Sequence, residues 1–178
     1  LTGATGIQGA SGATGYTGAT GQVGPQGPVG SGAVSYYGTF WDTTTQTASL
    51  TPKAMTINTT GDHNQISIVS GSQITFTYGG VYNLQFSAQL YNTDASNPYN
   101  TYIYLRKNGQ DVVDSMGDVT VPKKNPQTNG AAVTSWNYVV TVANGDYLEL
   151  WWKADATSVY MGAIAGGATG ATGGTYPE

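Results

Sequence analysis

The stretch ITFTYGGVYNLQFSAQL, residues 74–90, decides the fold of most of this chain. After the glycine pair, apolar or aromatic residues occupy every second position: Tyr82, Leu84, Phe86, Ala88 and Leu90. A period of two is typical of a β-strand with one face on a core and the other face toward water or a neighbour. Glycine supplies the positive φ values that tight turns need. The stretch therefore predicts two strands joined by a turn at Gly79–Gly80.

The same pattern continues toward the C-terminus. Two further sets of alternating residues are Trp136, Tyr138, Val140 and Val142, and Leu148, Leu150 and Trp152. Asn108–Gly109 and Asn144-Gly145-Asp146 separate the runs, as turn residues do between strands. No stretch keeps a helical period for ten residues. The sequence therefore predicts an all-β sandwich or jelly roll.

Upstream of this region the period is three. Ten glycines recur in strict register: Gly3, Gly6, Gly9, Gly12, Gly15, Gly18, Gly21, Gly24, Gly27 and Gly30. A collagen triple helix requires this spacing, because only glycine fits at its crowded axis, and it requires three chains. A flexible Gly/Thr linker is the alternative. We expect a collagen-like stalk at 1–32, a head at 33–165, a Gly/Thr-rich flexible tail at 166–178, and a homotrimer.

Composition excludes several classes of partner. Only 9% of the 178 residues are charged and the net charge is −4, so we expect neither nucleic-acid binding nor membrane insertion. Cysteine is absent, which removes disulfides and thiolate metal sites. Because the sequence starts at Leu1 rather than at Met, we expect it to be part of a longer chain.

Several head segments resemble the complement-C1q and tumour-necrosis-factor superfamily. Phe76 precedes a Gly-x-Tyr-x-x-x-Phe pattern formed by Gly80, Tyr82 and Phe86. The runs YLRKNG at 104–109 and ANGDYLEL at 143–150 are similar to later strand and turn motifs of that family. The resemblance covers most of residues 36–165. It implies a C1q/TNF-like jelly-roll head that trimerises.

Within that superfamily, other segments resemble collagen-containing fibre proteins of tailed phages and large viruses. They are YGTFWDTTTQT at 37–47, LQFSAQ at 84–89, LRKNG at 105–109 and SWNY at 135–138. The resemblance implies a virion-surface or extracellular location and contacts with other virion proteins through a region before Leu1. One departure is the end of the head, where the family pattern has an apolar final strand after a Pro-rich joint. Either 159–164 is the last strand, or residues beyond Glu178 complete the sheet.

Two strands are apolar or aromatic on both faces. Tyr102 and Tyr104 oppose Ile103 and Leu105, while Tyr147 and Trp151 oppose the apolar side of the strand at 147–152. A sandwich buries only one face of each strand, so we expect Tyr102, Tyr104, Tyr147 and Trp151 to lie in the trimer interface. Ordinary surface aromatics are the alternative.

Two long polar segments are the candidate ligand-contact loops. One spans 92–100 and contains Tyr99 and Asn100, and the other spans 117–131 and contains Lys123 and Lys124. Tyrosine and asparagine suit sugars, and the lysines suit acidic groups of a host cell-surface glycan or protein. Variable solvated loops are the alternative.

The chain offers little catalytic chemistry. His63 is the single histidine and sits in the turn-like cluster GDHN. Asp111, Asp114 and Asp118 lack the Gly-punctuated spacing of a calcium loop. We therefore expect no enzyme activity, no cofactor and no metal.

The leading interpretation of function is a non-enzymatic trimeric fibre or spike component of a virion, structural and involved in attachment to the host surface. A bacterial surface or spore-coat collagen-like filament is the first alternative. A secreted C1q-like recognition protein is the second.

Overall fold

The computed structural model describes residues 2–15 and 35–163 and divides the chain into two compact units, Leu1–Ala33 and Val34–Glu178. In the first unit, residues 2–15 are exposed and contain neither helix nor strand. Triple-helix formation by this unit stays a prediction. The remaining glycines of the repeat and the predicted tail at 166–178 lie outside the described residues.

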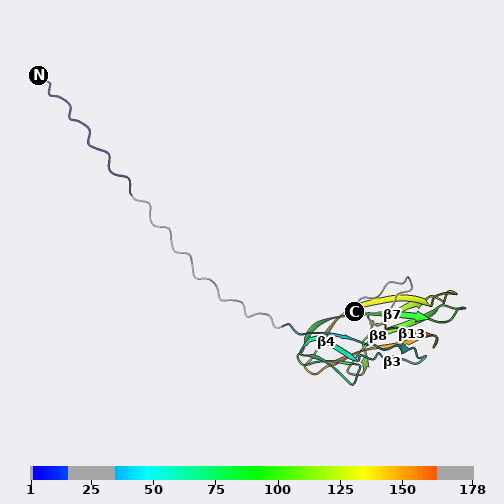
Figure 1. Ribbon diagram of the computed structural model, residues 1–178. Coiled ribbons are helices and arrows are strands. Elements are labelled where there is room, and N and C mark those ends of the chain that lie inside the picture. Colours follow the sequence, from blue (N-terminus) through cyan, green and yellow to red (C-terminus); the bar gives the residue numbers. More distant parts are fainter. Residues whose placement is uncertain (1, 16–34, 164–178) are drawn as a thin grey trace. The chain divides into compact units, whose positions relative to one another are not determined.

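Residues 35–163 of the second unit form strands and turns and no helix, so the all-β prediction is confirmed (Figure 1). The strands are β1 (Tyr37–Trp41), β2 (Gln46–Thr47), β3 (Lys53–Ala54), β4 (Thr59–Asn64), β5 (Ile66–Val69), β6 (Gln73–Phe76), β7 (Gly80–Asn92), β8 (Tyr99–Lys107), β9 (Gln110–Asp111), β10 (Gly117–Val121), β11 (Gly130–Val142), β12 (Tyr147–Ala154) and β13 (Val159–Met161).

Two larger antiparallel sheets carry the head, beside a two-stranded antiparallel sheet of β1 and β4. The first, which we call the β8/β12 sheet, has the order β10-β8-β12-β6-β5, with β3 added beside β12 and β9 beside β8. The second, the β7/β11 sheet, has the order β11-β7-β13-β2. The chain crosses between the sheets from β6 to β7, from β7 to β8, and at each connection from β10 to β13. Such repeated crossing between two antiparallel sheets is a jelly-roll arrangement.

The core lies between these sheets. Ile103 and Leu105 of β8 and Leu148 and Trp152 of β12 are completely buried. Burial of each such side chain stabilises the fold by about 1.5–3 kcal/mol. The inward-facing set predicted on β7 is confirmed by alternating burial, but of its members only Leu90 is fully buried. The other four remain partly exposed, so the described part of the chain does not cover them fully.

The predicted turns are confirmed in part. Asn108 and Gly109 adopt φ values of 50° and 78°, and Gly145 adopts 81°. Gly79 and Gly80 do not have positive φ, so that expectation is wrong. Gly79 is required for another reason, because a Cβ there would lie 2.9 Å from the carbonyl oxygen of Val142.

Candidate functional site

The two candidate contact loops lie side by side at one end of the head. Strand β10 pairs with β8 so that Val121 lies opposite Tyr99, and β11 pairs with β7 so that Gly130 lies opposite Asn92. This register brings residues 93–98 and 122–129 to the same end of the sandwich. The backbone N–H of Lys124 donates to the carbonyl of Asp94 at 2.7 Å and links the loops directly. We call residues 93–98 and 122–129 the tip loops.

The first tip loop is organised by two side chains that the sequence analysis did not single out. Asn92 is completely buried, donates to the Asn97 carbonyl and accepts from the Asp94 N–H, both at 2.9 Å. Asp94 accepts from the backbone of Ser96 and Asn97 and, at 2.9 Å, from the Tyr99 hydroxyl. Asn and Asp at a strand end are a turn signal that could have identified them.

These hydrogen bonds also shift the pKa values of the Asp94 and Tyr99 side chains. The N–H groups of Ser96 and Asn97 and the Tyr99 hydroxyl lower the pKa of Asp94, because they stabilise its carboxylate. The hydrogen bond to Asp94 raises the pKa of Tyr99. Tyr99, predicted as a contact residue, is therefore half-buried with its hydroxyl already bonded within the loop.

The second tip loop has a tight base and an exposed middle. A Cβ at Gly130 would overlap the Pro122 carbonyl, so only glycine fits there. Asn129 donates to the Tyr160 hydroxyl at 2.9 Å and ties the loop to β13. Between these anchors, Lys123 is exposed and Lys124 is half-buried. The structure thus brings both predicted lysines close to the loop of Tyr99.

Asn100 lies at the base of this surface. It is half-buried on β8, and its side-chain oxygen accepts from the Thr120 hydroxyl at 2.7 Å. Its backbone carbonyl accepts from the Asp155 N–H at 3.0 Å. These bonds place Asn100 in the support of the tip loops.

The chain enters the head at the opposite end. Asn64 donates to the Ser35 carbonyl at 2.9 Å, and Tyr36 stacks on Tyr78 with ring centroids 4.8 Å apart. Tyr78 lies two residues before the start of β7, whereas the first tip loop follows the last residue of β7. At ~3.3 Å per residue, the length of β7 separates the two ends by roughly 40 Å.

The four aromatic residues predicted at an interface share the outer face of the β8/β12 sheet. Tyr104 lies opposite Trp151, Tyr102 lies opposite Lys153, and all four aromatics are half-buried. Two of them are covered by cations of the same chain. The Arg106 guanidinium lies 4.3 Å from the Trp151 ring, and the Lys153 ammonium lies 4.8 Å from the Tyr102 ring. Burial raises the pKa of Tyr104.

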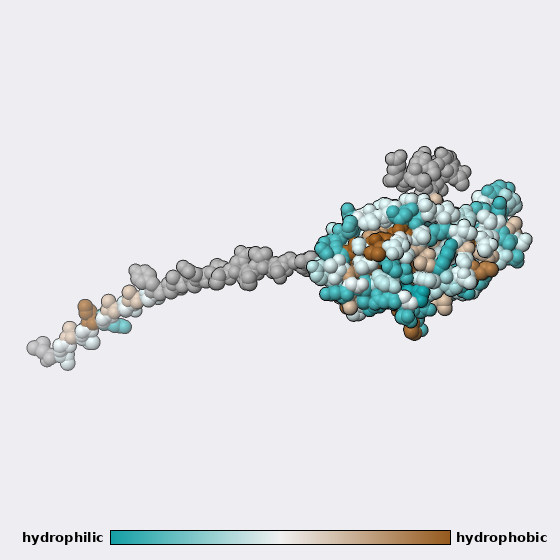
Figure 2. All heavy atoms as spheres, turned by 90° about the horizontal axis from the view of Figure 1, so that it is seen from below, coloured by the Kyte–Doolittle hydropathy of each residue, from teal (hydrophilic) through white to brown (hydrophobic). Residues whose placement is uncertain are grey.

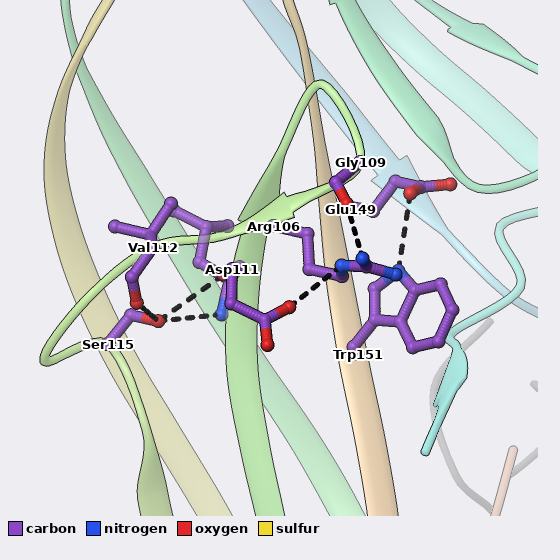
Figure 3. Close-up of polar contacts among 8 residues, drawn as sticks. Arg106, Gly109, Asp111, Val112, Ser115, Glu149 and Trp151 are labelled. Carbon is purple, nitrogen blue, oxygen red and sulfur yellow. Dashed lines mark hydrogen bonds and ion pairs between the residues drawn. The ribbon is translucent and has the colours of Figure 1, made fainter.

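Figure 3 shows how Arg106 is held over Trp151. Its Nε lies 2.8 Å from Asp111, and its guanidinium also donates to the Gly109 carbonyl. The indole N–H of Trp151 donates to Glu149 at 3.2 Å. Glu149, only 7% exposed, also accepts from the Ser72 hydroxyl at 2.8 Å. This outer face therefore carries its own network of charges.

The outer face of the β7/β11 sheet has no charge. Strands β7 and β11 contain no Asp, Glu, Lys, Arg or His. Their outward residues are Val81, Asn83, Gln85, Ser87, Gln89 and Tyr91 on β7, and Ala131, Val133, Ser135, Asn137, Val139 and Thr141 on β11. Val81, Val133 and Val139 are 70–76% exposed. The absence of charge over two 13-residue segments is the sequence signal that could have marked this face.

The weak chemical candidates lie apart from the tip loops. His63 lies in β4 rather than in the turn expected from the sequence; its ring is exposed, and the Gly61 carbonyl is the one hydrogen-bond partner found for the ring within residues 35–163. The Asp111 carboxylate forms an ion pair with Arg106. The described residues contain no group of three or more His, Asp or Glu that could hold a metal ion, and no helix long and apolar enough to cross a membrane.

Comparisons with known proteins find similar solved structures but no relative in sequence. No protein-family model matches, and no curated protein is similar in sequence. A solved structure described as Eiger TNF from S. frugiperda is similar with a TM-score of 0.44 and 10% identity, over 68% of this chain and 80% of that one.

Figure 2 shows one face of the head, on which polar groups predominate and hydrophobic groups gather in small patches.

Proposed function

We propose that this chain is a non-enzymatic component of a trimeric fibre, with a collagen-like stalk and a C1q/TNF-like head. The observation that carries the proposal is the strict three-residue glycine period directly before an all-β head. Glycine at every third residue is needed only where three chains pack closely, so the repeat requires two further copies. By its resemblance to viral fibre proteins, we place the fibre on a virion.

The β7/β11 face is the better candidate for contact between heads. Burial of a charged group costs several kcal/mol unless it is well paired, and the β8/β12 face carries Arg106, Asp111, Glu149 and Lys153. The β7/β11 face carries exposed valines and neutral polar groups, which tolerate burial. The aromatic face predicted from the sequence is the alternative interface.

The tip loops are the candidate surface for contact with a host glycan or protein. They lie at the end of the head away from Ser35, where the chain enters. Loops on a rigid β scaffold are common recognition sites. Lys123 and Lys124 add the positive charges that acidic sugars would meet.

Molar mass tests the proposal first. Light scattering coupled to size-exclusion chromatography should give the mass of three chains. Circular dichroism during a slow melt should show loss of the triple-helix signal before the head unfolds. A stable monomer would reject both the stalk and the trimeric head.

A binding measurement then tests the tip loops. The double variant Lys123→Ala and Lys124→Ala should reduce binding to host cells or acidic glycan arrays at least several-fold. Lys153→Ala, which removes a lysine from the β8/β12 face, is the matched control and should bind as the parent does. Equal loss in both variants would indicate nonspecific charge attraction.

A further inference from the structure

The long strand β7 is paired along one side only for most of its length. On one side β11 accompanies it from Gly80 to Asn92. On the other side β13 pairs only with Leu90, Tyr91 and Asn92. One more bond follows, from the Gly162 N–H to the Gln89 carbonyl at 3.0 Å. Beyond it, no strand of residues 35–163 pairs with this edge.

The alternation of a strand identifies the backbone groups on this open edge. In an antiparallel ladder, N–H and C=O groups of every second residue point to the same side. Because the Gln89 carbonyl points toward β13, the same groups of Ser87, Gln85 and Asn83 also point to that side. Three alternate residues therefore present donors and acceptors in strand geometry to an incoming chain.

Burial along β7 changes at the point where β13 ends. Leu90, flanked by β13, is 0% exposed, whereas the inward residues Leu84, Phe86 and Ala88 are only half-buried. They border a groove of about 830 Å³ that is also lined by Phe40 of β1 and by Ile57, which lies between β3 and β4. Apolar side chains that face a core but remain half-exposed mark a place where a layer of contacts is missing.

The chemistry of the groove specifies its occupant. Among the described residues that line it, Asp42 alone carries a charge. The edge offers strand hydrogen bonds, and the floor offers apolar contact at every second position. Ala163, the last described residue at the groove, has a side chain too small to fill it.

We propose that the open edge of β7 and its groove form an acceptor site for a β-strand, an extended polypeptide with bulky apolar side chains at alternating positions. Such a strand adds antiparallel to β7, continues the ladder that β13 begins, and covers Leu84 and Phe86. Backbone bonds supply affinity in this mode of binding, and the alternating pockets supply specificity. This inference does not depend on the proposed fibre function.

Two serines offer a matched pair of variants. Ser87 and Ser135 lie opposite each other in the β7–β11 ladder and are both exposed. The N–H of Ser87 points to the groove edge, and the N–H of Ser135 points to the far edge of β11, where residues 35–163 supply no partner strand. Proline is tolerated where a strand N–H has no partner, but it blocks a strand that would pair there.

The probe is a labelled, end-capped seven-residue peptide in which leucine alternates with threonine, titrated into the full chain by fluorescence anisotropy. We expect saturable binding that Ser87→Pro weakens at least ~10-fold, as loss of backbone bonds predicts. Ser135→Pro should bind within about threefold of the parent. The same peptide with its central residue changed to proline should not bind. Equal binding by Ser87→Pro and the parent would overturn the proposal.

Hydrogen exchange of the unmodified protein tests the site without any substitution. The amides of Asn83, Gln85 and Ser87 should exchange fast in the free protein and slow at least ~10-fold when the peptide is added. Slow exchange without peptide would show that the edge is already occupied, by residues 164–178 or by a second copy. That result would also overturn the proposal.

Discussion

The outer faces of the two sheets differ in how complete they are within one chain. On the β8/β12 sheet, Arg106 covers Trp151 and pairs with Asp111, and Glu149 accepts hydrogen bonds from Trp151 and Ser72. On the β7/β11 sheet, Val81, Val133 and Val139 stand exposed among neutral residues. The comparison teaches that charge on a sheet face marks contact with water, and that its absence over two long strands marks a face suited to contact another chain.

The largest expected effect comes from a charge placed on the uncharged face. In the proposed trimer, Val139→Arg puts like charges of three copies into the interface, so the solution mass should fall to about one third. Light scattering measures it. Val69→Arg is the control, because Val69 is exposed on β5 of the other sheet, and its mass should not change. Dissociation by Val69→Arg alone would instead place the interface on the aromatic face.

Removal of the cation over Trp151 tests the opposite face. Arg106→Ala loses the ring contact, the ion pair with Asp111 and the packing of its stem, so unfolding free energy should fall by about 1–2 kcal/mol. Urea denaturation measures it. Lys153→Ala removes the more distant cation over Tyr102 and should cost about 0.5 kcal/mol. Equal effects would mean that the Arg106 network adds nothing beyond a surface contact.

Acid should weaken the ion pair between Lys107 and Asp146, which helps to link the two sheets. Lys107 pairs with Asp146 at 2.8 Å and also donates to the Thr141 carbonyl of β11. The hydrogen bond from Lys107, with those from the Ala143 N–H and Asn108, lowers the pKa of Asp146 from 3.8 to about 2. Because the folded pKa is the lower one, this stabilisation is complete above pH 3.8 and is lost as pH falls toward 2.

Thermal melts across that pH range check this prediction. Asp146→Asn removes the titrating group, so its melting temperature should change less between these pH values than that of the parent. Parallel curves for the two proteins would contradict the assignment to Asp146.

The smallest change in stability is expected from a substitution in the core between the sheets. Thr101 is completely buried, and no hydrogen-bond partner is found for its hydroxyl among the described residues. Thr101→Val keeps the shape and removes an unsatisfied polar group, so stability should stay within about 0.5 kcal/mol or rise. Thr120→Val, which loses the bond to Asn100, is the contrasting variant and should be destabilised by about 0.5–1 kcal/mol. Comparable losses in both variants would show that Thr101 has a partner.

The strands could be predicted from the local sequence, because alternating burial requires alternating apolar and polar residues. Every second residue from Tyr82 to Leu90 faces inward as expected, and Asn108 and Gly109 form a turn with positive φ. Whether an inward residue is fully covered depends on strands far away in sequence. Leu90 is sealed by β13, some 70 residues later, whereas Phe86 is not, and no local signal separates them.

The candidate site was predictable in its parts but not in its assembly. Residues 92–100 and 117–131 had the composition of recognition loops, but their proximity follows from the β8–β10 and β7–β11 registers. Asn92 and Asp94 gave a local turn signal, whereas the contact of Lys124 with Asp94 gave none. Arg106 meets Trp151 by cross-strand register, which composition does not encode.

The tight base of the second tip loop has a consequence for how such a head changes over time. Gly130 and Asn129 fix the base of the loop, while Lys123, Asn125, Pro126, Gln127 and Thr128 are exposed. Mutation of these exposed positions changes the presented surface and leaves the scaffold intact. The surface that this end of the head presents can therefore change by a few substitutions in one short segment, without a compensating change elsewhere in the chain.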